Sequence, residues 1–282
     1  MTASWSYNGF EFGGDNYLRV VTAAEGFDMP QVRASDVPIA GGDGSLGGID
    51  TLDSRTVTLT VEIAAESQAE LYETLAELRR ATVHRSDDIP LTFQLDEALE
   101  PMRLYCRPRR RNIPHAEGRH AYGNVTCDLQ FFAPDPLIYS DAEYTGSTNA
   151  PSPAEGFTFP RDYPYDFGTP GSAEVINAFN AGDAPAPWTA VIYGPCDQPS
   201  IVGPGGNVTW EGSLGEGESL VIDAHPARRW VRVGGTSSQF ALLSDDSVWW
   251  LLEPGSNNVV LNSGDGNGTV EFRWRSAFYG AT

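Results

Sequence analysis

Hydrophobic and polar residues alternate along the first half of the chain in a pattern that predicts β-strands. The clearest case is residues 55–63, where every second residue from Val57 to Ile63 is apolar and the residues between them are threonine or glutamate. A period of two places the apolar side chains on one face, so this strand is expected to be half-buried. Further strands are expected at residues 17–22, 91–95, 102–107 and 124–132.

One amphipathic helix, over about residues 67–84, is expected directly after the strand at 55–63. Ser67 followed by Glu70 has the spacing of a capping box. Leucines recur on one helical face, acidic residues occupy the first half, and arginines gather near the end, an order that suits the helix dipole. The leucine stripe predicts that the helix packs on a sheet.

The pattern after residue 187 is typical of a β-sandwich. Eight short apolar runs are separated by turns rich in glycine and proline, as in sandwiches of the jelly-roll or galectin-like type. The expected strands are residues 188–193, 200–202, 207–210, 219–223, 230–233, 248–252, 257–261 and 269–274.

These patterns predict a mainly β protein with two domains. Residues 1–139 form an N-terminal β-rich domain that carries the single helix, and residues 188–282 form the C-terminal sandwich. Residues 140–187 are rich in proline, glycine and aromatic residues and are expected to be an ordered connector, because Phe and Tyr are depleted in flexible linkers.

Composition excludes several classes of function. The 282 residues carry a net charge of −20, and all 18 basic residues are arginines, so lysine chemistry and lysine-dependent phosphate loops are excluded. The excess of carboxylates argues against specific binding of nucleic acid and against anionic membranes. No signal peptide and no membrane-spanning run is found, so synthesis in the cytoplasm without membrane insertion is expected. Three widely spaced cysteines, Cys106, Cys127 and Cys196, are expected to be small buried hydrophobes.

Two motifs resemble ligand sites but lack the necessary context. Residues 42–47 fit G-x-G-x-x-G, yet a strand follows instead of a helix, so a mobile or interface loop is expected and no cofactor. His115 and His120 lack a third metal ligand nearby and are expected to be solvated loop histidines. No catalytic residue and no metal site is predicted, and the chain is expected not to be an enzyme, although a glycosidase pair of carboxylates stays open.

The cationic run from Arg107 to Arg111 stands out in so acidic a chain. It has two interpretations of equal weight: a clamp between subunits that holds carboxylates, or a solvated strand end. The candidate interface residues are Arg107, Arg109, Arg110 and Arg111.

The adjacent Trp249 and Trp250 lie on an expected strand, which places one indole on each face. One is expected in the sandwich core and the other at a contact with a partner protein or, as the less favoured alternative, with a sugar ring.

The order of these features resembles the distal tail proteins of long, non-contractile-tailed bacteriophages. The resemblance rests on the glycine loop near residue 44, the strand leading into one helix, the segment Phe131-Phe-Ala-Pro-Asp-Pro-Leu-Ile-Tyr139 and the terminal sandwich. Within the last part it rests on Val175-Ile-Asn177, Gly182-Asp183, Ile192-Tyr-Gly-Pro195, Leu220-Val-Ile-Asp223, Arg229-Trp-Val-Arg232 and Trp249-Trp-Leu-Leu-Glu-Pro-Gly-Ser-Asn257.

The resemblance implies a structural virion protein that forms a ring, usually a hexamer, at the distal end of the tail tube. The N-terminal domain would form the ring, and the galectin-like domain would project outward. Implied partners are the tail tube protein, the tape measure protein, a tail-associated hub or lysin protein and receptor-binding or other baseplate proteins, with DNA passing through an acidic lumen. The alternative function is a carbohydrate-binding sandwich that recognises a host surface glycan through Trp249 or Trp250.

Overall fold

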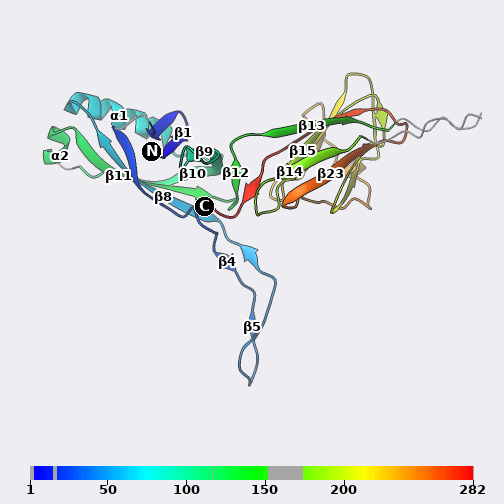
Figure 1. Cartoon of the computed structure of the whole chain (residues 1–282), viewed down its shortest axis with the longest axis horizontal. Coiled ribbons are helices and arrows are strands. Elements are labelled where there is room, and N and C mark those ends of the chain that lie inside the picture. Colours follow the sequence, from blue (N-terminus) through cyan, green and yellow to red (C-terminus); the bar gives the residue numbers. More distant parts are fainter. Residues whose placement is uncertain (1–2, 15–17, 116, 152–173, 282) are drawn as a thin grey trace, which may run out of the picture. The chain divides into compact units, whose positions relative to one another are not determined.

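The computed structural model describes residues 3–14, 18–115, 117–151 and 174–281, and it divides the chain into two compact units. The first unit comprises residues 1–142 and 278–282, and the second comprises residues 143–277. Both consist mainly of antiparallel strands (Figure 1). The mainly β fold predicted from the sequence is therefore confirmed.

The first unit is built on a large sheet with the strand order β2-β1-β9-β10-β11-β8-β3, and β12 also pairs with β10. The pairs along this order are antiparallel. The strands of this sheet are β1 (Ser4–Tyr7), β2 (Phe10–Gly13), β3 (Arg19–Glu25), β8 (Arg55–Ala64), β9 (Ile89–Gln94), β10 (Met102–Asn112), β11 (Asn124–Ala133), β12 (Ile138–Ser140) and β25 (Ala277–Phe278).

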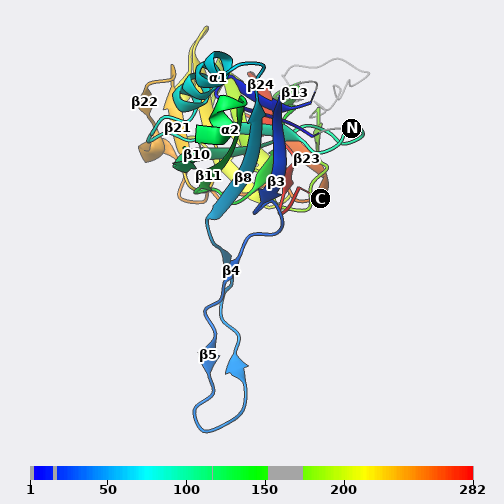
Figure 2. The same ribbon diagram turned by 90° about the vertical axis from the view of Figure 1, so that its left-hand side faces the viewer.

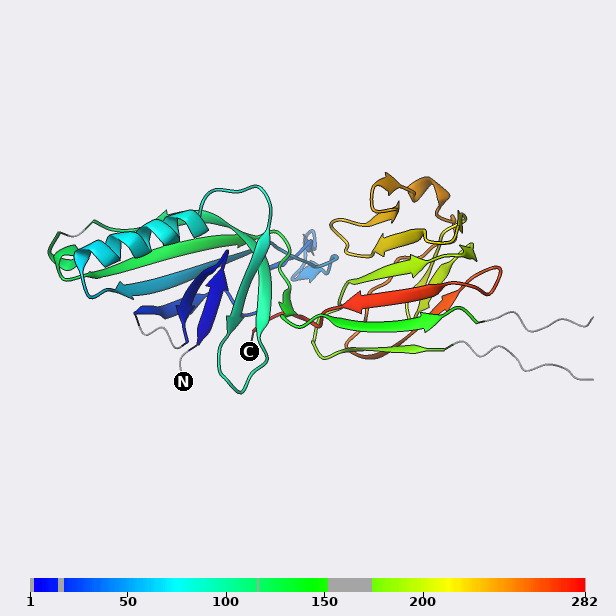
Figure 3. The same ribbon diagram turned by 90° about the horizontal axis from the view of Figure 1, so that it is seen from above.

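Helix α1 (Gln68–Ala81) covers one face of this sheet (Figure 3). The expected capping box is present: the Ser67 side chain accepts a hydrogen bond from the Glu70 amide, and the Glu70 carboxylate accepts one from the Glu66 amide. Leu71, Leu75 and Leu78 are fully buried against the sheet, as their spacing predicts. A second, short helix, α2 (Glu117–Ala121), precedes β11.

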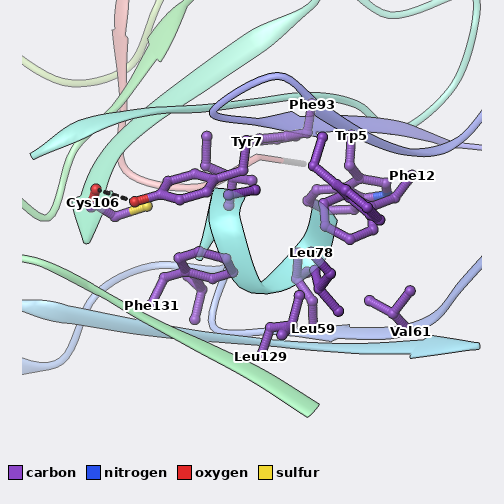
Figure 4. Packing of buried hydrophobic residues seen from close by; sticks show 14 of the residues in the cluster. Trp5, Tyr7, Phe12, Leu59, Val61, Leu78, Phe93, Cys106, Leu129 and Phe131 are labelled. Carbon is purple, nitrogen blue, oxygen red and sulfur yellow. Dashed lines mark hydrogen bonds between the residues drawn. The ribbon is translucent and has the colours of Figure 1, made fainter. Parts of the chain in front are cut away.

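The core of the first unit lies between α1 and the sheet, where aromatic residues meet the leucines (Figure 4). Trp5 stacks on Phe93 with the ring centroids 5.1 Å apart, and Tyr7 lies 4.7 Å from Phe131. The Tyr7 hydroxyl donates a hydrogen bond to the Cys106 carbonyl, so this buried polar group is satisfied. Side chains of β1 therefore cover the side of the core that lies opposite to β8 (Figure 4).

A long hairpin arm, residues 28–54, connects β3 to β8 and leaves the sheet at their ends (Figure 2). It contains two short ladders, β4 with β7 and β5 with β6. These strands are β4 (Val32–Arg33), β5 (Val37–Pro38), β6 (Ser45–Leu46) and β7 (Thr51–Leu52). The glycine loop of residues 41–48 forms the tip of this arm, where Gly41 and Gly44 have positive φ angles of 76° and 89°.

The second unit is a sandwich of two sheets with the orders β13-β24-β15-β20-β21-β22 and β14-β23-β17-β18. Trp188, Trp250 and Phe272 fill the space between them, with the Trp188 and Trp250 centroids 4.7 Å apart. The elements are β13 (Tyr144–Asn149), β14 (Ile176–Asn180), β15 (Trp188–Tyr193), β16 (Cys196–Asp197), β17 (Ser200–Gly203), β18 (Gly206–Thr209), β19 (Ser213–Leu214), β20 (Ser219–Asp223), β21 (Trp230–Val233), β22 (Ser237–Ser238), the 3-10 helix η1 (Phe240–Leu242), β23 (Gly255–Asn262) and β24 (Thr269–Trp274).

Residues 140–187, which the sequence predicted to be a connector between domains, belong in large part to the second unit. β13 pairs with β24 and β14 with β23, so the described ends of this segment are strands of the sandwich. Ile176 and Ala178 are buried between exposed neighbours, a period of two that the prolines and aromatic residues of the sequence obscured. Residues 152–173 of the expected connector lie outside the described residues.

The strand expected at residues 248–252 is not formed. The Val248 amide donates to the Asn207 carbonyl, and Leu252 makes an isolated bridge to Ala186, but no continuous ladder joins them. The Trp250 indole lies so close to Gly203 that a Cβ atom there would come within 2.3 Å of the ring. The segment is therefore held by packing of this indole and by single hydrogen bonds, and not by strand pairing.

Arg55, the first residue of β8, is 3% exposed and joins segments that are far apart in the sequence. Burial lowers its pKa to about 10, so the guanidinium is still protonated at neutral pH. It donates hydrogen bonds of 2.6 to 2.8 Å to the carbonyls of Gly26, Asp28, Pro136 and Tyr279. One side chain therefore fixes the base of the arm, the connection after β11 and the C-terminal segment.

Replacing Arg55 by methionine should destabilise the first unit, because four carbonyls at a partly buried site lose their donor. A buried acceptor left unsatisfied costs about 1–3 kcal/mol, and the losses are not additive, so we expect at least about 3 kcal/mol. Urea denaturation, with hydrogen exchange to follow each unit separately, measures the change. Arg80→Met is the control because Arg80 is exposed, and it should change stability by less than about 0.5 kcal/mol. Equal stability of the two variants would contradict the role given to Arg55.

Candidate functional site

The arginine run at residues 107–111 occupies the second half of β10, where a β-bulge separates its side chains. The pairing of β10 with β11 shifts between Pro108 and Arg110. In a regular strand Arg107, Arg109 and Arg111 would share one face, whereas an extra residue turns the following side chain to the opposite face. The four arginines consequently have different environments.

Arg111 points toward the end of helix α1. Its guanidinium lies 2.8 Å from the Thr82 hydroxyl and donates to the carbonyls of Arg79 and Thr82 at 3.1 and 3.2 Å. The last carbonyls of a helix have no partner within the helix, and a cation is favourable at this end of the dipole. Arg111 therefore has a structural role in its own chain.

Arg107 is also occupied within its own chain. It forms an ion pair of 3.4 Å with Asp88 and donates to the Ser86 carbonyl. Its guanidinium carbon lies 5.7 Å from the centre of the Phe132 ring. These contacts tie the loop before β9 to β10.

Arg109 and Arg110 are exposed and, unlike the exposed Arg111, make no hydrogen bond to the end of α1. The Arg109 guanidinium lies over the Phe132 ring at 4.5 Å, a cation–π contact that leaves its N–H groups free for other acceptors. Neither side chain makes an ion pair with any described residue of the chain. The contact between subunits thus stays a prediction. Of the four arginines, Arg109 and Arg110 are the two that remain available for it.

The two adjacent tryptophans have different surroundings, as the sequence predicts. Trp250 is 4% exposed and belongs to the sandwich core. Trp249 is partly exposed, with the Arg229 guanidinium 5.2 Å from its ring and Phe240 6.2 Å away. Only Trp249 has surface available for a partner or a sugar ring.

The prediction of solvated histidines is wrong for His120. This side chain is 3% exposed and lies in α2, with its Nε2 atom 3.2 Å from the Pro114 carbonyl oxygen and its ring against Tyr72. His115 is exposed, and the two imidazoles are 4.9 Å apart. Packing of α2 against α1 buries His120, which its charged sequence neighbours did not indicate.

The hairpin arm is larger than the mobile or interface loop that the sequence predicted at residues 42–47. Every residue from 31 to 51 is exposed, including large apolar side chains. The available signal was the wide spacing of apolar residues on both sides of the glycines, where Val37 and Ile39 are the one pair of large apolar residues in alternation. The exposed apolar residues of the arm are Met29, Val32, Val37, Ile39, Leu46 and Ile49.

Two features of other classes of protein are absent from the described residues. They contain no group of three or more His, Cys, Asp and Glu side chains placed to bind a metal ion. Neither helix of the described segments has the length and apolar character needed to cross a membrane.

Comparison with known proteins identifies the fold. Residues 181–278 match the family model for the siphovirus-type tail component, C-terminal domain. The resemblance to phage distal tail proteins predicted from the sequence is thereby confirmed. No curated protein matches the chain in sequence.

Solved structures of phage tail proteins are similar in fold to this protein over nearly its whole length. The Dit protein of phage SPP1, described as a paradigm of the hub adsorption apparatus in phages that infect Gram-positive bacteria, superimposes with a TM-score of 0.64 at 15% identity, covering 99% of this chain and 100% of that one. A chain of the phage P2 baseplate in its activated conformation with Ca gives 0.52 at 11% identity, with 98% of each chain covered. At these identities the likeness shows a shared fold.

All three cysteines are free and buried, as predicted. Burial is the main cause that raises the pKa of each thiol, to about 12 for Cys127 and about 11 for Cys196, and that of Cys106 also upward. Because the thiolate is the reactive form, these groups should be inert in the folded protein.

We expect no thiol to react with a disulfide reagent in the native protein at pH 8, and all three to react after unfolding in guanidinium. A Ser45→Cys variant is the control, because Ser45 is exposed at the tip of the arm and its replacement should add one rapidly reacting thiol. Absorbance of the released thiol measures the reaction. Rapid labelling of the native wild-type chain would contradict the burial of these residues.

Proposed function

We propose that this protein is the adaptor hub at the distal end of a siphovirus tail tube, a structural virion protein without catalytic activity. The observation that carries the proposal is the superposition on phage SPP1 Dit over nearly the full length of both chains, which includes both units. The tail component match in the second unit supports it independently of the structural comparison.

A closed ring, a hexamer by the resemblance, is the assembly that we propose for the hub. Six copies with a charge of −20 each carry −120, so contacts that offset repulsion are required. Arg109 and Arg110 suit this purpose because they are exposed and make no ion pair among the described residues. A predominantly acidic ring lumen would also let DNA pass without binding, since phosphate contacts need cations.

The proposed partners follow from a position at the end of the tube. They are the tail tube protein, the tape measure protein, a tail-associated hub or lysin protein, and receptor-binding or other baseplate proteins. The first unit would form the ring, and the sandwich would hold the outer proteins. The virion is the proposed location, after assembly in the host cytoplasm.

Light scattering across a concentration series, with negative-stain images of the largest species, tests the ring. Six chains of 30.5 kDa give about 183 kDa, and we expect a ring of this mass with an open lumen. The variant Arg109→Glu/Arg110→Glu should remain a folded monomer, because four units of charge change at the proposed contact while the core is untouched. An intact ring in this variant would rule out these arginines as the clamp.

A carbohydrate-binding sandwich is the second candidate, favoured by the partly exposed Trp249 beside the exposed Phe240, Leu242 and Val248. The Arg229 guanidinium already lies over the Trp249 ring, which reduces the face open to a sugar. We therefore expect a glycan array to show no binding. Binding that disappears in Trp249→Ala, with circular dichroism unchanged, would favour this candidate over the hub.

A further inference from the structure

The hairpin arm has many exposed apolar residues, and none of the described hydrogen bonds or ion pairs joins its residues 31–51 to another part of the chain. The hydrogen bonds described for residues 31–51 all run within the arm, such as the Gly48 amide to the Asp36 carboxylate and the Asp53 amide to the Gln31 carbonyl. Two ladders of two residues each are too short to be stable on their own in water. The arm needs a partner surface to become ordered.

The base of the arm, in contrast, is firmly attached. Phe27 is buried between Trp5 and Phe93, with ring centroids 5.1 and 5.0 Å away. Gly26 has a φ of 86° and lies so near Thr56 that a Cβ atom would come within 2.3 Å of the carbonyl oxygen. Arg55 binds the carbonyls on either side of Phe27, so the direction in which the arm leaves the sheet is fixed.

The outer part of the arm combines apolar and acidic side chains. Between residues 34 and 52 the only charged residues are Asp36, Asp43 and Asp50. The one arginine of the arm, Arg33, is nearer the base and pairs with Asp53 at 3.1 Å. Leu46 and Ile49, among these carboxylates, are 66% and 82% exposed. A partner of this segment should therefore offer cations together with some apolar surface.

The same chain carries a surface of the opposite charge, which we call the arginine face. It consists of Arg109 and Arg110, two exposed arginines that make no ion pair with any described residue. Arg111 contacts the end of α1, and the bulge turns Arg110 to the opposite side of the sheet, where Arg109 lies over Phe132. Phe132, beneath Arg109, supplies partly buried apolar surface there.

The arm of one copy cannot satisfy its own arginine face. Arm residue 42 is about 12 residues from β8, which corresponds to roughly 40 Å of extended strand leading away from the sheet (Figure 2). The arginine face lies on β10, in the sheet from which the arm departs, and so is far from the tip of the arm of the same copy. We propose that the outer arm of one copy docks on the arginine face of a second copy of this chain, with Asp43 and Asp50 facing Arg109 and Arg110. Such a head-to-tail contact uses two different surfaces and closes into rings when the rotation between copies permits.

This inference deepens the proposed function, because it names the carboxylates that the arginines of the ring would hold. It is tested by association between copies of any stoichiometry, so its outcome is separate from that of the closed ring. Asp43 and Asp50 are suitable for substitution because the described hydrogen bonds of the arm do not involve their side chains, in contrast to Asp36.

The decisive experiment uses charge reversal on each surface of the full-length chain and sedimentation velocity across a concentration series. Asp43→Arg/Asp50→Arg and Arg109→Glu/Arg110→Glu should each weaken self-association at least tenfold. The four-site variant that carries both changes should associate again, since the signs on the two surfaces are exchanged together. An equimolar mixture of the two double variants should also associate, because each arm then meets a surface of opposite sign.

A matched control separates local contacts from the change in net charge. Asp245→Arg/Asp246→Arg shifts the net charge of the chain by the same amount as the arm variant, at two exposed carboxylates of the second unit. It should not weaken association. Circular dichroism of every variant establishes that the fold is retained.

Three outcomes would overturn the inference. The first is a wild-type chain that is monomeric at every concentration, and the second is association that the arm variant leaves unchanged. The third is a four-site variant, and a mixture, that fail to associate although both double variants are folded. If the charge-exchanged pair associates but only open chains or dimers are seen, the docking contact is supported and the closed ring of the hub proposal is what fails.

Discussion

A single buried guanidinium organises the first unit. Arg55 donates hydrogen bonds to four backbone carbonyls, whose dipoles stabilise its charge together with the nearby carboxylates of Asp28 and Asp135. Burying a charge is costly unless all of its donors are used, and a planar group with five N–H donors can reach several segments at once where lysine could not. The fold therefore depends on the start of the arm, the segment after β11 and the end of the chain meeting at one point.

This arrangement explains why the arm can be exposed and yet directed. Phe27 and Arg55 fix its two ends in the core, so exposing the apolar residues beyond them does not weaken the packing of the unit. Apolar side chains in contact with water are normal when scattered, but a continuous set along a projecting hairpin indicates a binding surface. The rigid base lowers the entropic cost of docking because only the outer ladders must become ordered.

The sequence predicted those elements whose pattern is set by local rules, and it failed where distant packing decides. The period of two in β8 and the capping box at Ser67 act within a few residues, and both were predicted correctly. The hairpin β1–β2 was missed although its turn is marked by Asn8 and Gly9, which adopt positive φ angles of 49° and 82° between aromatic strands. Trp250 was expected on a strand, whereas contact with Gly203, 47 positions earlier, replaces strand pairing. The bulge in β10 gives the arginines of one run separate roles, and Pro108, beside the shift in pairing, was its signal in the sequence.

The distribution of arginines gives the strongest argument that the chain is built to associate. In a protein with a charge of −20, each cation finds an excess of carboxylates, and most arginines in the described segments have an ion pair or a set of carbonyls. Arg109 and Arg110 are adjacent on β10, beside Arg107 and Arg111, and have neither. Clustering like charges raises the energy of the isolated chain, because the repulsion among them is not offset internally. An acidic arm that likewise lacks cations over its outer part is the complementary half of this arrangement. Contact between the arm of one copy and the arginine face of another offsets the repulsion among the arginines and the repulsion among the carboxylates of the arm. No single copy can make this contact with itself.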